Sequence, residues 1–131
     1  MAKSPITIED LKNYIEYLDK EEWRPVVGVD NYFISNYGRC FSLHRNALIK
    51  PSLNYFKSNT PYLCYYLMNN AKGKWYKAHR LVAQAFIPNP LSKEEIHHIN
   101  GDATDNRAGN LAWVTQEEHF KEHNRKSRKT A

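Results

Sequence analysis

The chain has 131 residues, 41% of them hydrophobic and 13% aromatic, which is enough for one modest core. Lys and Arg outnumber Asp and Glu by 19 to 14, and the resulting net charge of +5 favours an anionic partner such as nucleic acid. The composition argues against a membrane span, a secretory signal and a cysteine framework. No apolar run approaches the roughly 20 residues of a span, the N-terminus lacks an apolar core, and Cys40 and Cys64 form neither a zinc motif nor a disulfide framework. We therefore expect a soluble protein with two ordinary thiols that works in the cytoplasm.

The first half of the chain predicts one helix followed by short strands. Thr7 can cap a helix whose apolar residues, from Ile8 to Leu18, recur at helical spacing. The stretch "WRPVVGVDNYFISNYGRCFSL" combines β-branched and aromatic residues with the turn sequence "SNYG", so we expect short strands and a hairpin at 24–44. A second strand pair is expected at 61–68 and 74–79, joined by a turn over "NNAKGK".

Helical spacing returns at residues 79–86, "HRLVAQAF", and the prolines of "IPNP" end this helix. The segment "EIHHI" then predicts a short strand, "NGDATDNRAGN" a loop and "LAWV" a second strand. Thr115 can cap a final helix, with Glu118 completing a capping box. The order strand, loop, strand, helix at the end of a strand-rich chain predicts an α+β fold.

Four of the six histidines lie in this last part of the chain, and their spacing suggests a metal site. His119 and His123 are one helical turn apart, so they could chelate a divalent ion. Surface histidines at this spacing also arise by chance. Adding His97 gives three nitrogens, with positions left open for water and phosphate, which is typical of a catalytic site.

His97 and His98 are neighbours on the predicted strand, so their rings must point to opposite faces. We expect one ring to face the helix and its metal, and the other to face outward to the substrate side. A neutral imidazole with a pKa near 6.5 can take a proton from water. The alternative is that His98 is a partly buried polar residue without chemistry.

With these pieces in order, residues 97–123 resemble the HNH, or ββα-metal, nuclease motif, whose three letters are His98, Asn110 and His119. The segment "HRLVAQAFIPNP" resembles the helix before this motif in phage and intron-encoded homing endonucleases, and "WRPVVGVDNYFISNYGRCFSL" resembles a small motif ahead of it. The resemblance implies a strand-rich, nuclease-associated region at 22–78, an HNH core at 79–124 and a basic tail at 125–131 within one compact domain. It implies a metal-dependent endonuclease that hydrolyses phosphodiester bonds of double-stranded DNA inside a phage-infected bacterium.

The resemblance also implies roles for single residues. His98 would be the general base, and Asn110 would brace the loop that holds it. His97, His119 and His123 would bind one divalent ion. The homing branch commonly carries Asp and Asn where this chain has His97 and His119, so a nitrogen-rich ligand set favours Zn²⁺, Ni²⁺, Co²⁺ or Mn²⁺ over Mg²⁺.

Six basic side chains close to the predicted site could contact DNA phosphates, although each could also be a solvated surface charge. These are Arg80, Lys121, Arg125, Lys126, Arg128 and Lys129. A DNA-binding module without catalysis and a zinc-stabilised structural domain are the alternative functions. The sequence leaves open whether the protein is a monomer that nicks or a homodimer that cuts both strands.

Overall fold

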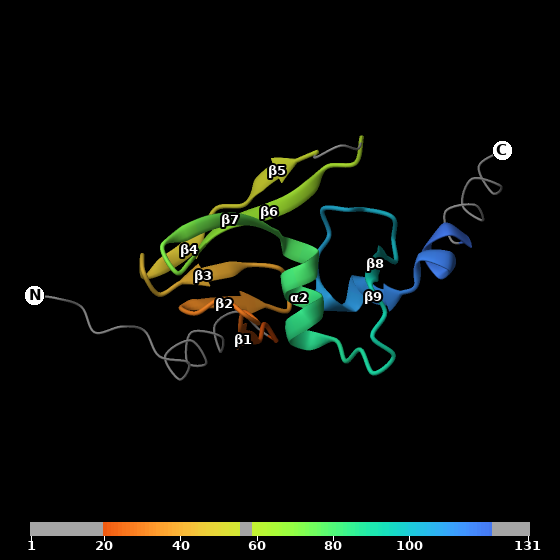
Figure 1. Ribbon diagram of the computed structural model, residues 1–131, viewed down its shortest axis with the longest axis horizontal. Helices are drawn as coiled ribbons and strands as arrows, with labels where there is room; N and C mark the ends of the chain where they lie inside the picture. The colour runs from red at the N-terminus through yellow and green to blue at the C-terminus, as the bar shows by residue number, and fades with distance from the viewer. Residues whose placement is uncertain (1–19, 56–58, 122–131) are drawn as a thin grey trace, which may run out of the picture.

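The computed structural model describes residues 20–55 and 59–121. It has three small antiparallel sheets and one central helix (Figure 1). The first sheet has four strands in chain order: β1 (Trp23–Pro25), β2 (Tyr32–Ser35), β3 (Cys40–Ser42) and β4 (Ala47–Ile49). The strands and the hairpin predicted within 24–44 are confirmed, whereas β4 was not predicted.

The second sheet has the order β5–β6–β7, with β5 at Ser52–Asn54, β6 at Tyr62–Asn69 and β7 at Lys72–Lys77. The two longer strands are where we expected them, but the turn between them is shorter than "NNAKGK". Asn70 and Ala71 both have positive φ, 52° and 66°. This backbone suits a two-residue hairpin loop, so Asn69 already pairs with Lys72.

Helix α2 (Ala78–Phe86) follows β7 without a break, as predicted from the spacing of its apolar residues. It lies between the first two sheets on one side and a third, two-stranded sheet on the other (Figure 1). The third sheet pairs β8 (Glu95–His98) with β9 (Leu111–Val114), and a short 3-10 helix, η1 (Ala108–Asn110), leads into β9. Both predicted strands of the histidine segment are therefore present.

The last described element is a helix at residues 116–121. The predicted capping box at its start is confirmed. The backbone N–H of Glu118 donates to Thr115 Oγ1 over 3.1 Å, and the backbone N–H of Thr115 donates to the Glu118 carboxylate over 3.2 Å. These reciprocal bonds satisfy donors that the first helical turn leaves unpaired, and they fix the direction in which the helix leaves β9.

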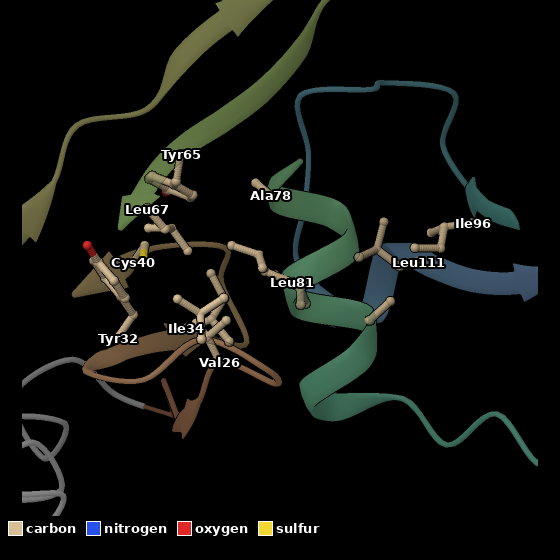
Figure 2. Packing of buried hydrophobic residues seen from close by; sticks show 13 residues of the cluster. Val26, Tyr32, Ile34, Cys40, Tyr65, Leu67, Ala78, Leu81, Ile96 and Leu111 are labelled. Atoms are coloured by element: carbon tan, nitrogen blue, oxygen red, sulfur yellow. The ribbon is translucent and has the colours of Figure 1, made fainter. Parts of the chain in front are cut away.

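One apolar core joins the elements across α2 (Figure 2). Ile34 of the first sheet and Leu67 of the second pack with Leu81 of the helix, and Ile96 and Leu111 of the third sheet close the cluster from the other side. All five side chains are at least nine-tenths buried. The shared core fixes the third sheet, which carries the histidines, against the strand-rich part of the chain.

An ion pair with a buried carboxylate holds the start of the first sheet. The carboxylate of Glu21 is fully buried, and it accepts hydrogen bonds from Nε and Nη2 of Arg39 and from the hydroxyl of Ser35. Removing the cation of such a pair strongly destabilises the fold, because the buried carboxylate then has no compensating charge. The pair ties Glu21, two residues before β1, to the turn between β2 and β3.

Three further expectations concern the rest of the chain. The helix predicted from Thr7 lies outside the described residues. Cys40 and Cys64 are both buried free thiols, as expected. Within residues 20–55 and 59–121, no helix is both long and apolar enough to cross a membrane.

Candidate active site

A pocket of about 160 Å³ brings three of the predicted histidines together. His97 and His98 come from β8, and His119 comes from the helix at residues 116–121. Strand β6 and the residues before it form another wall. The lining residues are Thr60, Tyr62, Ile96, His97, His98, Gly101, Ala103 and His119.

His97 and His119 face each other across the junction of strand and helix. Their ring centres are 5.7 Å apart, with an interplanar angle of 67°. Glu95, two residues before His97 on the same side of β8, places Oε2 2.9 Å from Nδ1 of His119. A carboxylate on one ring nitrogen fixes the orientation of an imidazole and increases its basicity as a metal ligand.

The distance between these rings fits a shared cation. A Zn–N bond is about 2.0–2.1 Å, so two rings whose centres are 5.7 Å apart are close enough to share an ion. Among the residues that the structure describes, no three His, Cys, Asp or Glu side chains form a group that could hold a metal. The third predicted ligand, His123, lies outside these residues.

His98 is only 9% exposed, so the expectation that its ring faces outward is wrong. Its Nε2 lies 2.9 Å from Oδ1 of Asn106. The ring packs edge to face against His79 of α2 at 5.0 Å and lies 6.5 Å from the ring of Tyr62. The inward position follows from the alternation of β8, which turns Ile96 and His98 toward the core.

Asn110 closes the loop between β8 and β9. Its Nδ2 donates to Oδ1 of Asn100 over 3.0 Å and to the backbone carbonyl of Asp105 over 2.9 Å. Its Oδ1 accepts the backbone N–H of Asn100 over 2.9 Å. Asn110 therefore connects both ends of the loop, whereas the residue that accepts a hydrogen bond from His98 is Asn106.

Two family matches cover most of the described chain. Residues 21–77 match the NUMOD4 motif, and residues 76–121 match the HNH endonuclease family. The second match contains the paired strands, the closing asparagine and all three histidines of the pocket. Residues 76–121 form an HNH endonuclease domain.

Relatives of known name support this assignment. The chain is 36% identical over 104 residues to uncharacterized HNH endonuclease L247 of Acanthamoeba polyphaga mimivirus, covering 76% of this chain and 25% of the relative. It is 29% identical over 99 residues to DNA endonuclease I-HmuI of Bacillus phage SP01, covering 72% and 53%. The solved structure of the HNH homing endonuclease I-HmuI, described for DNA binding and cleavage, superposes with a TM-score of 0.70 at 30% identity, covering 84% of this chain and 60% of that one. The α+β prediction is confirmed, and the chain spans between a quarter and about half of the length of these relatives in sequence.

The loop of the HNH domain is fixed from within by its own acidic residues. Asp102 accepts the hydroxyl and the backbone N–H of Thr104, and these bonds lower the pKa of its carboxyl group. Hydrogen bonds from the Arg107 guanidinium lower the pKa of Asp105 to about 2. Both carboxylates are therefore charged at neutral pH, and each bridges residues two apart within the loop.

The turn between β2 and β3, the predicted "SNYG" turn, supports the same loop from outside the HNH domain. The carbonyl of Asn36 accepts the backbone N–H of Ala108 over 2.8 Å. Gly38 has a φ of +92°, and a Cβ at this position would approach Cβ of Asn106 to 3.2 Å. The NUMOD4 segment therefore contacts the residue that holds His98.

Of the predicted DNA-contacting residues, two lie in the described part of the chain. Arg80 donates from Nη2 to the backbone carbonyl of Glu94 over 2.7 Å, and its guanidinium lies over the ring of Trp113, so it helps to join α2 to the third sheet. Lys121 is exposed and lies 3.5 Å from Glu117. The other predicted residues, Arg125, Lys126, Arg128 and Lys129, lie outside the described residues.

Sequence reasoning missed three neighbours of His98. Asn106 is one of several polar residues in its loop, and Tyr62 is far away in sequence. His79 did leave a signal, because it shares a helix face with the buried Val82 and Ala83. A histidine on an apolar helix face suggests a special environment, and burial, together with His98, Lys77 and Arg80, lowers the pKa of His79 to about 3.

Proposed function

We propose that the protein is a metal-dependent DNA endonuclease of the homing type that hydrolyses phosphodiester bonds. The observation that carries this proposal is the pocket in which His98, held by Asn106, lies next to the paired rings of His97 and His119. A base beside a pair of metal-binding imidazoles is the arrangement that metal-assisted hydrolysis requires. Relatives from a Bacillus phage and a mimivirus support a virus-encoded enzyme that acts inside the infected cell.

His98 is the proposed general base. The Asn106 atom that faces its ring is the amide oxygen, which only accepts hydrogen bonds. Nε2 of His98 therefore carries the proton, and Nδ1 carries the lone pair that takes a proton from the attacking water. Asn110 supports His98 indirectly, because it closes the loop that contains Asn106.

His97 and His119 are the proposed metal ligands, with His123 as the third. The bound ion would offset the negative charge that develops on the phosphate and on the leaving 3′ oxygen. Glu95 orients His119 for this role. The nitrogen-rich set favours Zn²⁺, Ni²⁺, Co²⁺ or Mn²⁺ over Mg²⁺, since Mg²⁺ prefers oxygen ligands.

Phosphate contacts supply most of the affinity for double-stranded DNA in this proposal. The formal net charge of +5 and the basic residues at and beyond Lys121 favour a polyanion. Affinity should therefore fall steeply with salt. Because each site cuts one strand, a monomer would nick DNA and a homodimer could break both strands.

A plasmid assay tests the function directly. Purified protein is incubated with supercoiled plasmid and, separately, with Mn²⁺, Mg²⁺, Zn²⁺, Ni²⁺ or Co²⁺. We expect cleavage with at least one ion, no cleavage in EDTA, and products with 5′-phosphate and 3′-hydroxyl ends. His98→Ala should abolish cleavage while metal and DNA binding remain, whereas His44→Ala, outside the pocket, should cut normally. Wild-type cutting by His98→Ala would exclude His98 as the base.

Metal removal separates this proposal from a zinc-stabilised structural domain. A structural ion contributes directly to folding, so stripping it unfolds the protein. We expect that EDTA-treated protein keeps its circular dichroism spectrum and loses only cleavage. Loss of the folded spectrum together with activity would favour the structural role instead.

A further inference from the structure

We infer that Tyr62 and His79 are positioning residues for His98, so that the cleavage centre is assembled from both the NUMOD4 segment and the HNH domain. This inference rests on the proposed role of His98 as the base. Tyr62 belongs to β6, in the segment that matches NUMOD4, and His79 belongs to the first turn of α2. Neither residue is among the three that give the HNH motif its name.

The three rings contact one another in a closed triangle. The ring centres of His79 and His98 are 5.0 Å apart, those of Tyr62 and His79 are 5.2 Å apart, and those of Tyr62 and His98 are 6.5 Å apart. These distances lie within the range in which aromatic rings attract each other in tilted or edge-to-face pairs. His98 is thus held by rings from two other elements in addition to its bond to Asn106.

The hydrogen bond to Asn106 cannot fix the ring alone. One bond to Nε2 leaves the imidazole able to swing about that bond, and the position of the basic Nδ1 would then vary. Contacts with Tyr62 and His79 restrict this motion. A displacement of about 1 Å in a catalytic group can lower a rate by about 100-fold, so these contacts should affect the chemical step more than DNA binding.

The stability of the fold does not explain why residue 79 is a histidine. Its side chain is 7% exposed, and within the described residues its buried Nδ1 has no hydrogen-bond partner. Such an atom destabilises a fold relative to an apolar side chain of similar shape. An apolar side chain such as leucine would suit the helix face that residue 79 shares with Val82 and Ala83, so the imidazole serves something other than packing.

Tyr62 is placed by contacts on its other side. The Nζ atom of Lys77 lies 4.7 Å from the centre of the Tyr62 ring, an attractive cation–π contact. Tyr62 also lines the pocket together with His97, His98 and His119. Strand β6 therefore contributes part of the pocket wall. This strand lies outside residues 76–121, which match the HNH family.

Four variants test the inference: His79→Leu and Tyr62→Leu remove a ring, Tyr62→Phe keeps it, and Tyr66→Leu alters an exposed tyrosine of the same strand outside the pocket. Initial nicking rates are measured against plasmid concentration, with the ion that best supports the wild-type protein. We expect kcat to fall about 10- to 100-fold in both ring-removing variants, with KM unchanged. Tyr62→Phe and Tyr66→Leu should keep the wild-type kcat, and His79→Leu should melt no lower than the wild-type protein.

A spectroscopic measurement without metal or DNA reports positioning itself. In ¹⁵N-histidine-labelled protein, the ring nitrogens of His98, assigned with His98→Ala, should show the single Nε2–H tautomer in wild type and Tyr62→Phe. Both Leu variants should keep this tautomer, because the bond to Asn106 remains, but their His98 ring signals should shift or broaden because the ring moves. Unchanged kcat or an unchanged His98 spectrum in the folded Leu variants would overturn the inference. A wild-type protein that does not nick DNA would instead refute the proposed function, and the spectra would still decide the positioning.

Discussion

Oδ1 of Asn106 lies 2.9 Å from Nε2 of His98, inside a loop that is closed by other asparagines. Removing this acceptor should free the His98 ring to adopt the wrong tautomer. We expect Asn106→Ala to lower kcat by about 10- to 100-fold, part of the 10²–10⁴-fold that a positioned base typically contributes. Asn89→Ala is the control, because Asn89 makes similar loop hydrogen bonds to Lys93 away from the pocket. Equal nicking rates for the two variants would show that Asn106 does not act on the base.

The carboxylate of Glu95 should set the metal affinity of His119. Loss of a carboxylate that orients a ligating histidine typically weakens metal binding by 10- to 100-fold. We expect Glu95→Ala to do so for Zn²⁺ or Mn²⁺ in isothermal titration calorimetry, while its exposed neighbour Glu94→Ala binds as the wild-type protein does. The same affinity in both variants would mean that Glu95 does not support the ligand.

The ion pair between the buried carboxylate of Glu21 and Arg39 should matter for folding and not for chemistry. Arg39→Ala leaves the fully buried Glu21 carboxylate without its cation, and we expect the free energy of unfolding to fall by about 3–5 kcal/mol. Glu22→Ala is the matched control, since its exposed pair with Arg24 should contribute about 0–1 kcal/mol. Urea denaturation measures both values. A loss below about 1 kcal/mol for Arg39→Ala would contradict the burial of Glu21 that we describe.

The low pKa of His79 predicts a specific sensitivity to acid. Its folded pKa of about 3 lies below the ordinary value of 6.5, so the unfolded chain binds the extra proton throughout that interval. Stability is therefore fully retained above about pH 6.5 and falls as the pH drops toward 3. Between about pH 7 and pH 5 the wild-type protein should lose about 2 kcal/mol more than His79→Leu, as measured by urea denaturation at both pH values. Equal losses of stability in the two proteins would show that His79 binds its proton as readily in the folded state as in the unfolded state.

Local patterns in the sequence predicted the elements that have strong local signals. The capping box of Thr115 and Glu118, the spacing in α2 and the strand around His97 depend on neighbours in sequence. Strands β4 and β5 were missed because neither has a buried apolar face: their residues are exposed or half-buried, so no alternation marks them. Their pairing depends on tertiary contacts.

The same distinction applies to the candidate site. The order strand, loop, strand, helix was enough to bring His97 and His119 together. The environment of His98 could not be predicted in this way, because Tyr62 of β6 and His79 of α2 reach it only through tertiary packing. Its inward orientation is a property of the shared core.

The bond between Asn36 in the turn after β2 and Ala108 in the nuclease loop has an evolutionary consequence. Recombination that replaced one module and left the other would join a loop to a turn with which it had not co-evolved. An active nuclease would be preserved only by exchanges that keep this turn and this loop matched, or that transfer both segments together. Chimaeras with the crossover placed before residue 20 should therefore tolerate new partners better than those joined at residue 77.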